Sequence, residues 1–415
     1  MQLTTKIHSS GLRSLSVLSP DSGSVTIMIM VAVGSRHEQP NEYGLAHFVE
    51  HTIFKGTPTR PSSKQVGMEI ESFGGSSNAF TSYDYTGYYI KVPKESFKEA
   101  FNVLADIFLN PLFPAADIEI ERGVIIEEIK MYEDRPTSRV SDAWSQNFFG
   151  TDSSLGREIS GDIDSVSNLK PEQFKEFIAK HYYAENCMVV VSGNVTQDEI
   201  DAAVEKNLSA IPAKGDKLDS GYPEFTFVES ELRKKDIRIQ KDLQQAHIIM
   251  GGLGIKRNDP ERFALQVGNA ILGSGFGSRL FQVIREEKGL AYYVYSRISS
   301  FKDTGVYQIG MGVDKNRIEE SILAVKDQIA EIAAGKYTQQ EFDRAKNYLV
   351  GGIVTDMETS EDLASYYGML ELLGQEKLTL EQLKDKIKAV TIADVQAVWQ
   401  KVFTVENLYT TVLSS

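Results

Sequence analysis

The order of predicted strands and helices in the first half of the chain recurs in the second half. In the first half, a helix near Gly44–Phe54 follows two strand-like runs, and a buried strand, Cys187–Ser192, comes last. In the second half, a strand at Ala246–Gly252 precedes a helix at Pro260–Leu272, and a strand at Leu408–Leu413 comes last. A pattern that recurs after about 200 residues indicates internal duplication. We therefore expect an α+β fold class, with two homologous α/β sandwich domains, each a mixed sheet with helices packed on it.

A polar segment rich in glycine and proline, Ala213–Pro223, separates the two halves. A chain of 415 residues is too long for one ordinary hydrophobic core. We expect one domain over residues 1–213, a linker over 214–229, and a homologous domain over 230–415.

Hydrophobic periodicity and turn residues predict the other elements. The predicted strands are 14–18, 24–33, 86–92, 292–299 and 305–313, and the predicted helices are 64–73, 96–109, 116–132, one that begins at Lys170-Pro171, 318–334, 340–355 and 380–401.

Charge and cysteine content exclude several classes of protein. The formal net charge is −14, which argues against nucleic-acid binding, where a basic surface is expected. The acidic balance suits general solubility, or a basic substrate if the acids line a cavity. The longest apolar run, Val25–Val33, is broken only by Thr26, has the length of a buried strand and is too short to span a membrane. Cys187 is the only cysteine, and no signal peptide is recognisable, so we expect a reducing, cytoplasmic location and no membrane partner.

The segment His47-Phe48-Val49-Glu50-His51 places three chemically active side chains on one face of a predicted helix. Because a helix turns about 100° per residue, Glu50 and His51 lie about −60° and +40° from His47. Two imidazoles four positions apart can bind one Zn²⁺, and the carboxylate beside them can take a proton from a zinc-bound water. The order His-x-x-Glu-His is the inverzincin signature. The alternative is a chance match to a short pattern.

A catalytic zinc also needs a third protein ligand and an open position. The predicted helix 116–132 offers candidates on a face that includes Val124, Ile125, Met131 and Tyr132. Glu128 falls in the middle of that face, where a carboxylate is costly unless it is paired or bound to metal. Glu121 shares this direction and is either a partner of a ligand or a surface charge, and Glu127 at the edge of the face is interpreted as solvated.

Two stretches of the chain match the motifs of a known peptidase family. One runs from Gly44 through His51 to Phe54-Lys55-Gly56-Thr57, and the other is Glu121–Glu128. They resemble the pitrilysin, insulinase and mitochondrial processing peptidase family of zinc peptidases, in its short bacterial form. His51 and Glu128 are 77 positions apart, within the family's usual range. The resemblance implies that Glu128 is the third zinc ligand and that Glu121 supports the catalytic site.

The segment from Gly74 to Thr86 is similar to the part of the family that includes its substrate-binding edge strand. Asn78, Ala79 and Phe80 would then hold an extended peptide by main-chain hydrogen bonds. From the residues alone, an ordinary turn and strand is the alternative.

In the second half, Ser278–Tyr292 also follows the family pattern. The resemblance implies that Arg285 and Tyr292 contact substrate, because both side chains can donate hydrogen bonds to a carbonyl or a developing oxyanion. From the residues alone they are a surface arginine and a core tyrosine. The glycine-rich Gly273–Gly277 lacks a following Gly-Lys-Ser/Thr, so a phosphate loop is not expected, and the resemblance implies a substrate-handling loop.

The second half carries no His-x-x-Glu-His motif. Its counterpart region, Phe263–Leu272, is apolar apart from Gln266 and Asn269. The resemblance implies that such a half is non-catalytic and contacts substrate. We therefore expect the zinc-binding catalytic domain over residues 1–213 and the non-catalytic, substrate-contacting domain over 230–415.

We therefore expect a zinc metalloendopeptidase with one Zn²⁺ per chain, a metal-activated water and Glu50 as general base. The resemblance implies peptides or unfolded polypeptide segments as substrates. It also implies a homodimer, with a heterodimer with a non-catalytic relative as the alternative. The competing hypotheses are a non-catalytic scaffold or core subunit of a related complex, and a zinc hydrolase that acts on another bond.

Overall fold

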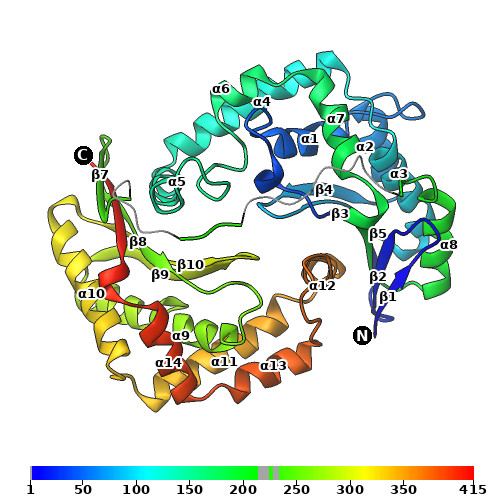
Figure 1. Cartoon of the computed structure of the whole chain (residues 1–415). Coiled ribbons are helices and arrows are strands. Elements are labelled where there is room, and N and C mark those ends of the chain that lie inside the picture. The colour runs from blue at the N-terminus through cyan, green and yellow to red at the C-terminus, as the bar shows by residue number, and fades with distance from the viewer. Residues whose placement is uncertain (1, 214–223, 228–232) are drawn as a thin grey trace. The chain divides into compact units, whose positions relative to one another are not determined.

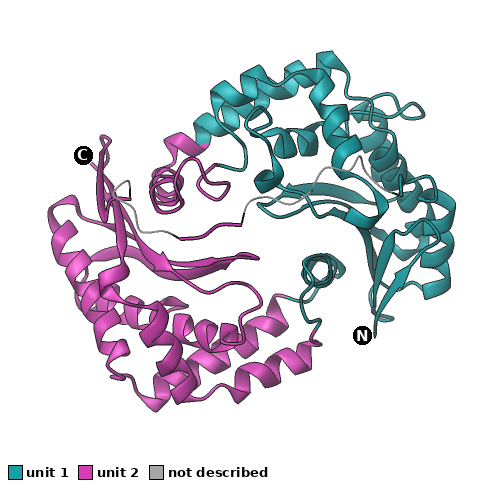
Figure 2. Ribbon diagram, in the orientation of Figure 1, with its two compact units in different colours: residues 1–131, 158–223, 357–377 teal, residues 132–157, 224–356, 378–415 magenta. Residues whose placement is uncertain are grey.

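The computed structural model describes residues 2–213, 224–227 and 233–415. Two compact units make up the chain (Figures 1 and 2): unit 1 contains residues 1–131, 158–223 and 357–377, and unit 2 contains residues 132–157, 224–356 and 378–415. Apart from residues 224–227, the expected linker at 214–229 lies outside the described residues. Within the described residues, no helix combines the length and the apolarity needed to cross a bilayer.

Unit 1 is built on a six-stranded sheet with the strand order β1-β2-β6-β3-β5-β4. β2 and β6 are parallel, and the other neighbours are antiparallel. The elements of this unit are β1 (Gln2–Ile7), β2 (Arg13–Leu18), β3 (Ser24–Val31), α1 (Leu45–Ile53), α2 (Ser63–Ser72), β4 (Ser76–Thr81), β5 (Thr86–Pro93), α3 (Phe97–Leu109), α4 (Ala115–Asp134), α6 (Ile163–Asn168), α7 (Pro171–His181), β6 (Cys187–Gly193), α8 (Gln197–Asn207) and α12 (Ser360–Leu372), with the final residues of α4 grouped with unit 2.

Unit 2 is built on a five-stranded sheet with the order β7-β11-β8-β10-β9. Its elements are α5 (Pro136–Phe149), β7 (Asp236–Gln240), β8 (Ala246–Leu253), α9 (Arg262–Gly273), the π-helix η4 (Phe281–Glu287), β9 (Ala291–Ser300), β10 (Gly305–Val313), α10 (Ile318–Ala333), α11 (Gln339–Thr355), α13 (Leu380–Ala389), α14 (Ile392–Val402) and β11 (Tyr409–Ser414).

The two sheets share one topology. If β2, β6, β3, β5 and β4 are matched in order to β7, β11, β8, β10 and β9, each pair of neighbours agrees in direction. The single parallel pair falls at the same place in both sheets, between β2 and β6 and between β7 and β11. The expected α+β fold with duplicated domains is therefore confirmed.

Each unit takes one helix from the other half of the sequence (Figure 2). α12 packs on β2, β3 and β6 of unit 1, and α5 packs on β8 and β11 of unit 2. On α12, Gly368 lies so close to Met30 and Val190 that a Cβ at this position would stand 2.5 Å from Met30 Sδ. The predicted domain boundaries at residues 213 and 230 stay a prediction. The compact units differ from this division because residues 132–157 belong to unit 2 and residues 357–377 belong to unit 1.

Most predicted elements lie within a few residues of the observed ones, and the exceptions have local causes. The predicted helix 380–401 is two helices, because the backbone leaves the helical conformation at Val390 and extended Thr391 begins α14 by accepting a hydrogen bond from Asp394 N. The predicted helix 116–132 extends to Asp134 as α4, and only Arg135 separates it from α5, because Pro136 occupies the first turn of α5, where a proline costs no hydrogen bond. β1, β7, α5, α6, α8, α12 and the π-helix η4 were not predicted.

A buried histidine is part of the core of unit 1. His181, at the end of α7, is 2% exposed, and its ring centroid lies 4.7 Å from that of Phe177. Neither ring nitrogen has a hydrogen-bond partner among the described residues. Burial, together with Lys180 and His37, lowers the pKa of His181 to about 3. The folded chain therefore holds this imidazole neutral.

We expect His181→Phe to reduce the loss of stability at acid pH. The pKa of His181 is about 6.5 in the unfolded chain, so the unfolded state binds more protons than the folded state below that pH. Its contribution to the free energy of unfolding is present at neutral pH and falls by about 1.4 kcal/mol for each pH unit below about 6.5. Urea denaturation at neutral pH and near pH 5 should show a gain for the variant only at the lower pH. An equal difference at both pH values would contradict this.

Candidate metal centre

Helix α1 carries His47, Glu50 and His51 on one side and core residues on the other. Phe48 and Val49 are fully buried, which fixes the rotation of the helix about its axis. The carboxylate of Glu38 accepts hydrogen bonds from Gly44 N at 3.0 Å and Ala46 N at 2.8 Å. An anion at this position satisfies backbone donors that have no partner within the helix.

Helix α4 supplies the third candidate ligand. Ile118, Ile125 and Ile129 are buried in the unit 1 core. Arg122 donates hydrogen bonds to the carbonyl oxygens of Val166 and Leu169, and its guanidinium carbon lies 5.5 Å from the ring centroid of Phe48 on α1. These contacts hold α4 beside α1.

The inward face of α4 differs from the predicted one. Val124 and Met131 are each 47% exposed and Tyr132 is 37% exposed, whereas Glu121 is only 8% exposed. The helical wheel had placed these apolar residues inward because they outnumber the polar ones on that side. The prediction was wrong for these three residues and correct for Ile125. Glu127 is exposed, as expected, and pairs with Lys130.

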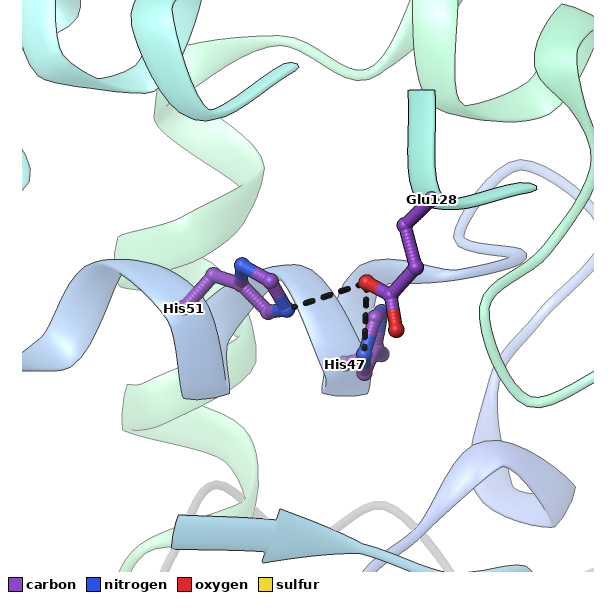
Figure 3. Close-up of side chains that lie close together, drawn as sticks. All are labelled: His47, His51 and Glu128. Atoms are coloured by element: carbon purple, nitrogen blue, oxygen red, sulfur yellow. Dashed lines mark ion pairs between the residues drawn. The ribbon is translucent and has the colours of Figure 1, made fainter. Parts of the chain in front are cut away.

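Three ligand atoms from the two helices converge at one point (Figure 3). Glu128 Oε2 lies 3.8 Å from His47 Nε2 and 3.5 Å from His51 Nε2, and the three atoms lie within 4.8 Å of one another. Ligand atoms about 2.0–2.2 Å from one tetrahedral zinc stand about 3.3–3.5 Å apart. Two imidazoles and a carboxylate in this arrangement fit a zinc ion that keeps an open position, and among the described residues no other group of this kind is present.

The electrostatics of the site suit a cation. Burial and the neighbouring His51 lower the pKa of His47 to about 4, so this imidazole is neutral at neutral pH, as a metal ligand must be. Burial raises the pKa of Glu50, although the hydrogen bond from Thr81 acts in the opposite direction. Thr81 Oγ1 donates that bond to Glu50 Oε2 over 2.6 Å.

Glu121 lies behind the ligands and contacts one of them. Its Oε2 is 3.3 Å from His51 Nδ1, and its Oε1 accepts a hydrogen bond from Lys55 Nζ. A carboxylate bound to the second nitrogen of a ligating histidine orients the ring and selects its tautomer. His47 Nδ1, by contrast, is buried without a hydrogen-bond partner among the described residues.

Asn78, Ala79 and Phe80 lie on β4, which is the edge strand of the unit 1 sheet next to β5. The backbone amide of Ala79 donates a hydrogen bond to the side-chain oxygen of Asn78 over 2.9 Å. Thr81, the partner of Glu50, is the last residue of the same strand. The edge strand therefore ends at the candidate catalytic carboxylate.

Arg285 and Tyr292 lie together in unit 2, on η4 and β9. The guanidinium carbon of Arg285 lies 5.9 Å from the ring centroid of Tyr292 and 4.8 Å from that of Phe281. Tyr292 is 72% exposed, so the interpretation of this residue as a core tyrosine is wrong. In α9, the counterpart of α1, Asn269 hydrogen-bonds with Ser296 and is not part of a metal site.

Comparison with known proteins identifies the family. Residues 13–162 match the family model "Insulinase (Peptidase family M16)", and residues 168–349 match "Peptidase M16 inactive domain". The protein named "Uncharacterized zinc protease YmxG" of Bacillus subtilis is 34% identical over 394 residues, which cover 95% of this chain and 94% of that protein. The chain belongs to the M16 peptidase family. A Streptomyces coelicolor member, named "Uncharacterized zinc protease SCO5738", is 34% identical over 94% of this chain and 84% of that protein.

Solved structures share the fold. A structure from Pseudomonas fluorescens, titled as a peptidase M16 inactive domain, has a TM-score of 0.90 at 22% identity and covers 100% of this chain and 98% of that one. A Helicobacter pylori protease also has a TM-score of 0.90, at 21% identity, with 100% and 99% covered. The M16 match extends over the candidate ligands His47, His51 and Glu128 and over the half that carries Arg285.

The sequence predicted no role for Lys55, Thr81 or Glu38. Lys55 and Thr81 contact carboxylates of the candidate metal centre, and Glu38 binds backbone amides at the start of α1. Lys55 and Thr81 were noted only as parts of the matching stretches, and Glu38 was not singled out. Thr81 and Lys55 bind the carboxylates of Glu50 and Glu121. The one sequence signal for them is position, since Lys55 closely follows the His-x-x-Glu-His helix.

Proposed function

We propose that this M16 chain is a zinc-dependent endopeptidase that hydrolyses peptides or unfolded polypeptide segments. The observation that carries this proposal is the convergence of His47 Nε2, His51 Nε2 and Glu128 Oε2 within 4.8 Å, with Glu50 on the same helix as both histidines. Relatives named zinc proteases support it. A bound zinc would supply a Lewis acid that lowers the pKa of water and polarises a carbonyl.

Glu50, Thr81 and Glu121 have separate proposed roles in the reaction. Glu50 acts as general base toward the attacking water and then as proton donor to the leaving amine nitrogen. Thr81 holds one oxygen of Glu50, which leaves the other oxygen for the proton. Glu121 holds His51 in the orientation that turns Nε2 toward Glu128.

The substrate is proposed to bind as an extended strand on the open edge of β4. Main-chain hydrogen bonds from Asn78, Ala79 and Phe80 would align it with little dependence on side-chain sequence. The Asn78 side chain, which covers the amide of Ala79, would move aside. Because Thr81 at the end of β4 contacts Glu50, a peptide on this edge would lead toward the catalytic carboxylate.

Arg285 and Tyr292 are proposed to donate hydrogen bonds to the substrate, from the same chain or from a partner chain. The expected homodimer, with a heterodimer with a non-catalytic relative as the alternative, stays a prediction, as does the cytoplasmic location. The match of residues 168–349 to a model described as an inactive domain supports a non-catalytic second half.

Metal analysis combined with peptide cleavage tests the proposed function. We expect about one zinc per chain and cleavage of a quenched fluorescent library of unstructured peptides. A zinc chelator should abolish cleavage, and added zinc should restore it. The same protein incubated with magnesium after chelation is the control, because magnesium prefers oxygen ligands.

Two other outcomes are informative. If the protein binds zinc and cleaves no peptide alone, a missing partner subunit becomes the leading explanation. If it binds no zinc, the proposal is wrong and the scaffold hypothesis replaces it.

A further inference from the structure

Lys55 pairs with Glu121, the carboxylate that faces the candidate ligand His51. Its ammonium group donates to Glu121 Oε1, while Glu121 Oε2 faces His51 Nδ1. Each oxygen of Glu121 is thus committed to one partner. Because Glu121 is only 8% exposed, water offers little compensation for its charge if Lys55 is removed.

Hydrogen bonds to α3 hold the loop that follows Lys55. Thr57, Thr59 and Arg60 all donate hydrogen bonds to Asp106 Oδ2 on α3, over 2.6, 2.6 and 2.7 Å. Gly56 has a φ of +145°, and a Cβ at this position would stand 2.9 Å from the backbone of Pro61. The chain can turn this tightly after α1 only with glycine there.

We propose that Lys55 is a positioning residue for the metal centre, which acts through Glu121 to hold His51 with Nε2 free and directed toward Glu128. This inference rests on the proposed zinc site. With Lys55 present, Glu121 is an acceptor of fixed orientation, and His51 keeps its proton on Nδ1. Without Lys55, the Glu121 carboxylate is free to rotate or to turn toward the metal, and the orientation of His51 is lost.

Whether removal of Lys55 weakens or tightens zinc binding distinguishes a positioning role from a purely electrostatic effect of its charge. A positive charge near the site repels Zn²⁺, so removal of a lysine that acts only through its charge should tighten zinc binding. If Lys55 positions His51 through Glu121, its removal should weaken zinc binding instead. Substitutions of partners behind a metal ligand typically cost about 10–100-fold in affinity.

The experiment measures zinc dissociation constants by competition with a chromogenic chelator in the Glu50→Gln background, where no cleavage occurs. We expect Lys55→Met to weaken zinc binding about tenfold and Lys55→Arg to stay within about threefold of the parent. Lys130→Met is the matched control, because Lys130 pairs with the exposed Glu127 on α4 and does not contact Glu121. This control should leave zinc affinity unchanged or slightly tighter.

A double-mutant cycle tests whether Lys55 acts through Glu121. In a Glu121→Gln background, Lys55→Met should cause no further weakening. Equal weakening in both backgrounds, or unchanged or tighter zinc binding in the single variant, would overturn the proposal.

A measurement on the zinc-free protein tests the role of Lys55 independently of the proposed function. Nitrogen-15 NMR of labelled histidines at mildly alkaline pH should show His51 with its proton on Nδ1 in the parent and in Lys55→Arg. Lys55→Met should increase the form with the proton on Nε2. If the parent binds no zinc, the proposed function fails, and an unchanged His51 tautomer in Lys55→Met would independently reject the role of Lys55.

Discussion

Replacement of Glu50 by glutamine is expected to slow peptide hydrolysis by about 10²–10⁴-fold, the usual contribution of a general base, and to leave about one zinc per chain in place. Glutamine keeps the shape of the side chain and can still accept the hydrogen bond from Thr81. It cannot take up a proton. Because the converging ligand atoms belong to His47, His51 and Glu128, zinc content should not change. Turnover and metal content, measured on the same preparation, check this result.

Glu127→Gln is the matched control for this substitution. It removes an equal charge next to the candidate ligand Glu128, from a side chain that is 73% exposed and paired with Lys130. We expect it to retain turnover. If Glu50→Gln keeps more than about a tenth of the parent rate, Glu50 is not the general base. Loss of zinc in Glu50→Gln would instead indicate that Glu50 supports the metal centre.

Trp144→Ala is expected to lower the free energy of unfolding by about 3–5 kcal/mol, as is typical for a buried tryptophan. Trp144 is fully buried and stacks on Phe148 with ring centroids 4.7 Å apart. Its indole N–H donates to the carbonyl of Tyr409 on β11 over 2.8 Å. A Cβ on Gly251 of β8 would stand 2.8 Å from its ring. Trp144 therefore fixes α5, a helix from the first half of the sequence, on the unit 2 sheet.

Urea denaturation followed by circular dichroism checks this prediction, with Phe276→Ala as the control. Phe276 is also an aromatic residue of unit 2, but it is 75% exposed, and its removal should cost less than about 1 kcal/mol. A similarly small cost for Trp144→Ala would contradict the packing of α5 on β8 and β11. A large decrease in the free energy of unfolding would support the view that the packing of α5 stabilises unit 2.

The elements that local patterns predicted well are those whose burial follows from their own sequence. The strand β3 (Ser24–Val31) is predictable from its apolar composition, and the helix α3 (Phe97–Leu109) from the helical spacing of its apolar residues. α12 has Leu363 and Tyr367 buried beside partly buried Tyr366, so its pattern has no clear apolar stripe. Its capping box at Thr359 and Asp362 was the available signal. The burial of α12 on the sheet of unit 1 depends on β3 and β6, which are distant in sequence.

The sequence by itself determined that His47, Glu50 and His51 share one helical face, because helix geometry fixes the direction of residues three and four apart. It also indicated the duplication and, through the matching motifs, the family. Only the tertiary structure decided how α4 is rotated, that Glu128 reaches both histidines, and that Thr81 and Lys55 bind the two nearby carboxylates. These contacts join different elements, and their geometry follows from how those elements pack, which no local period encodes.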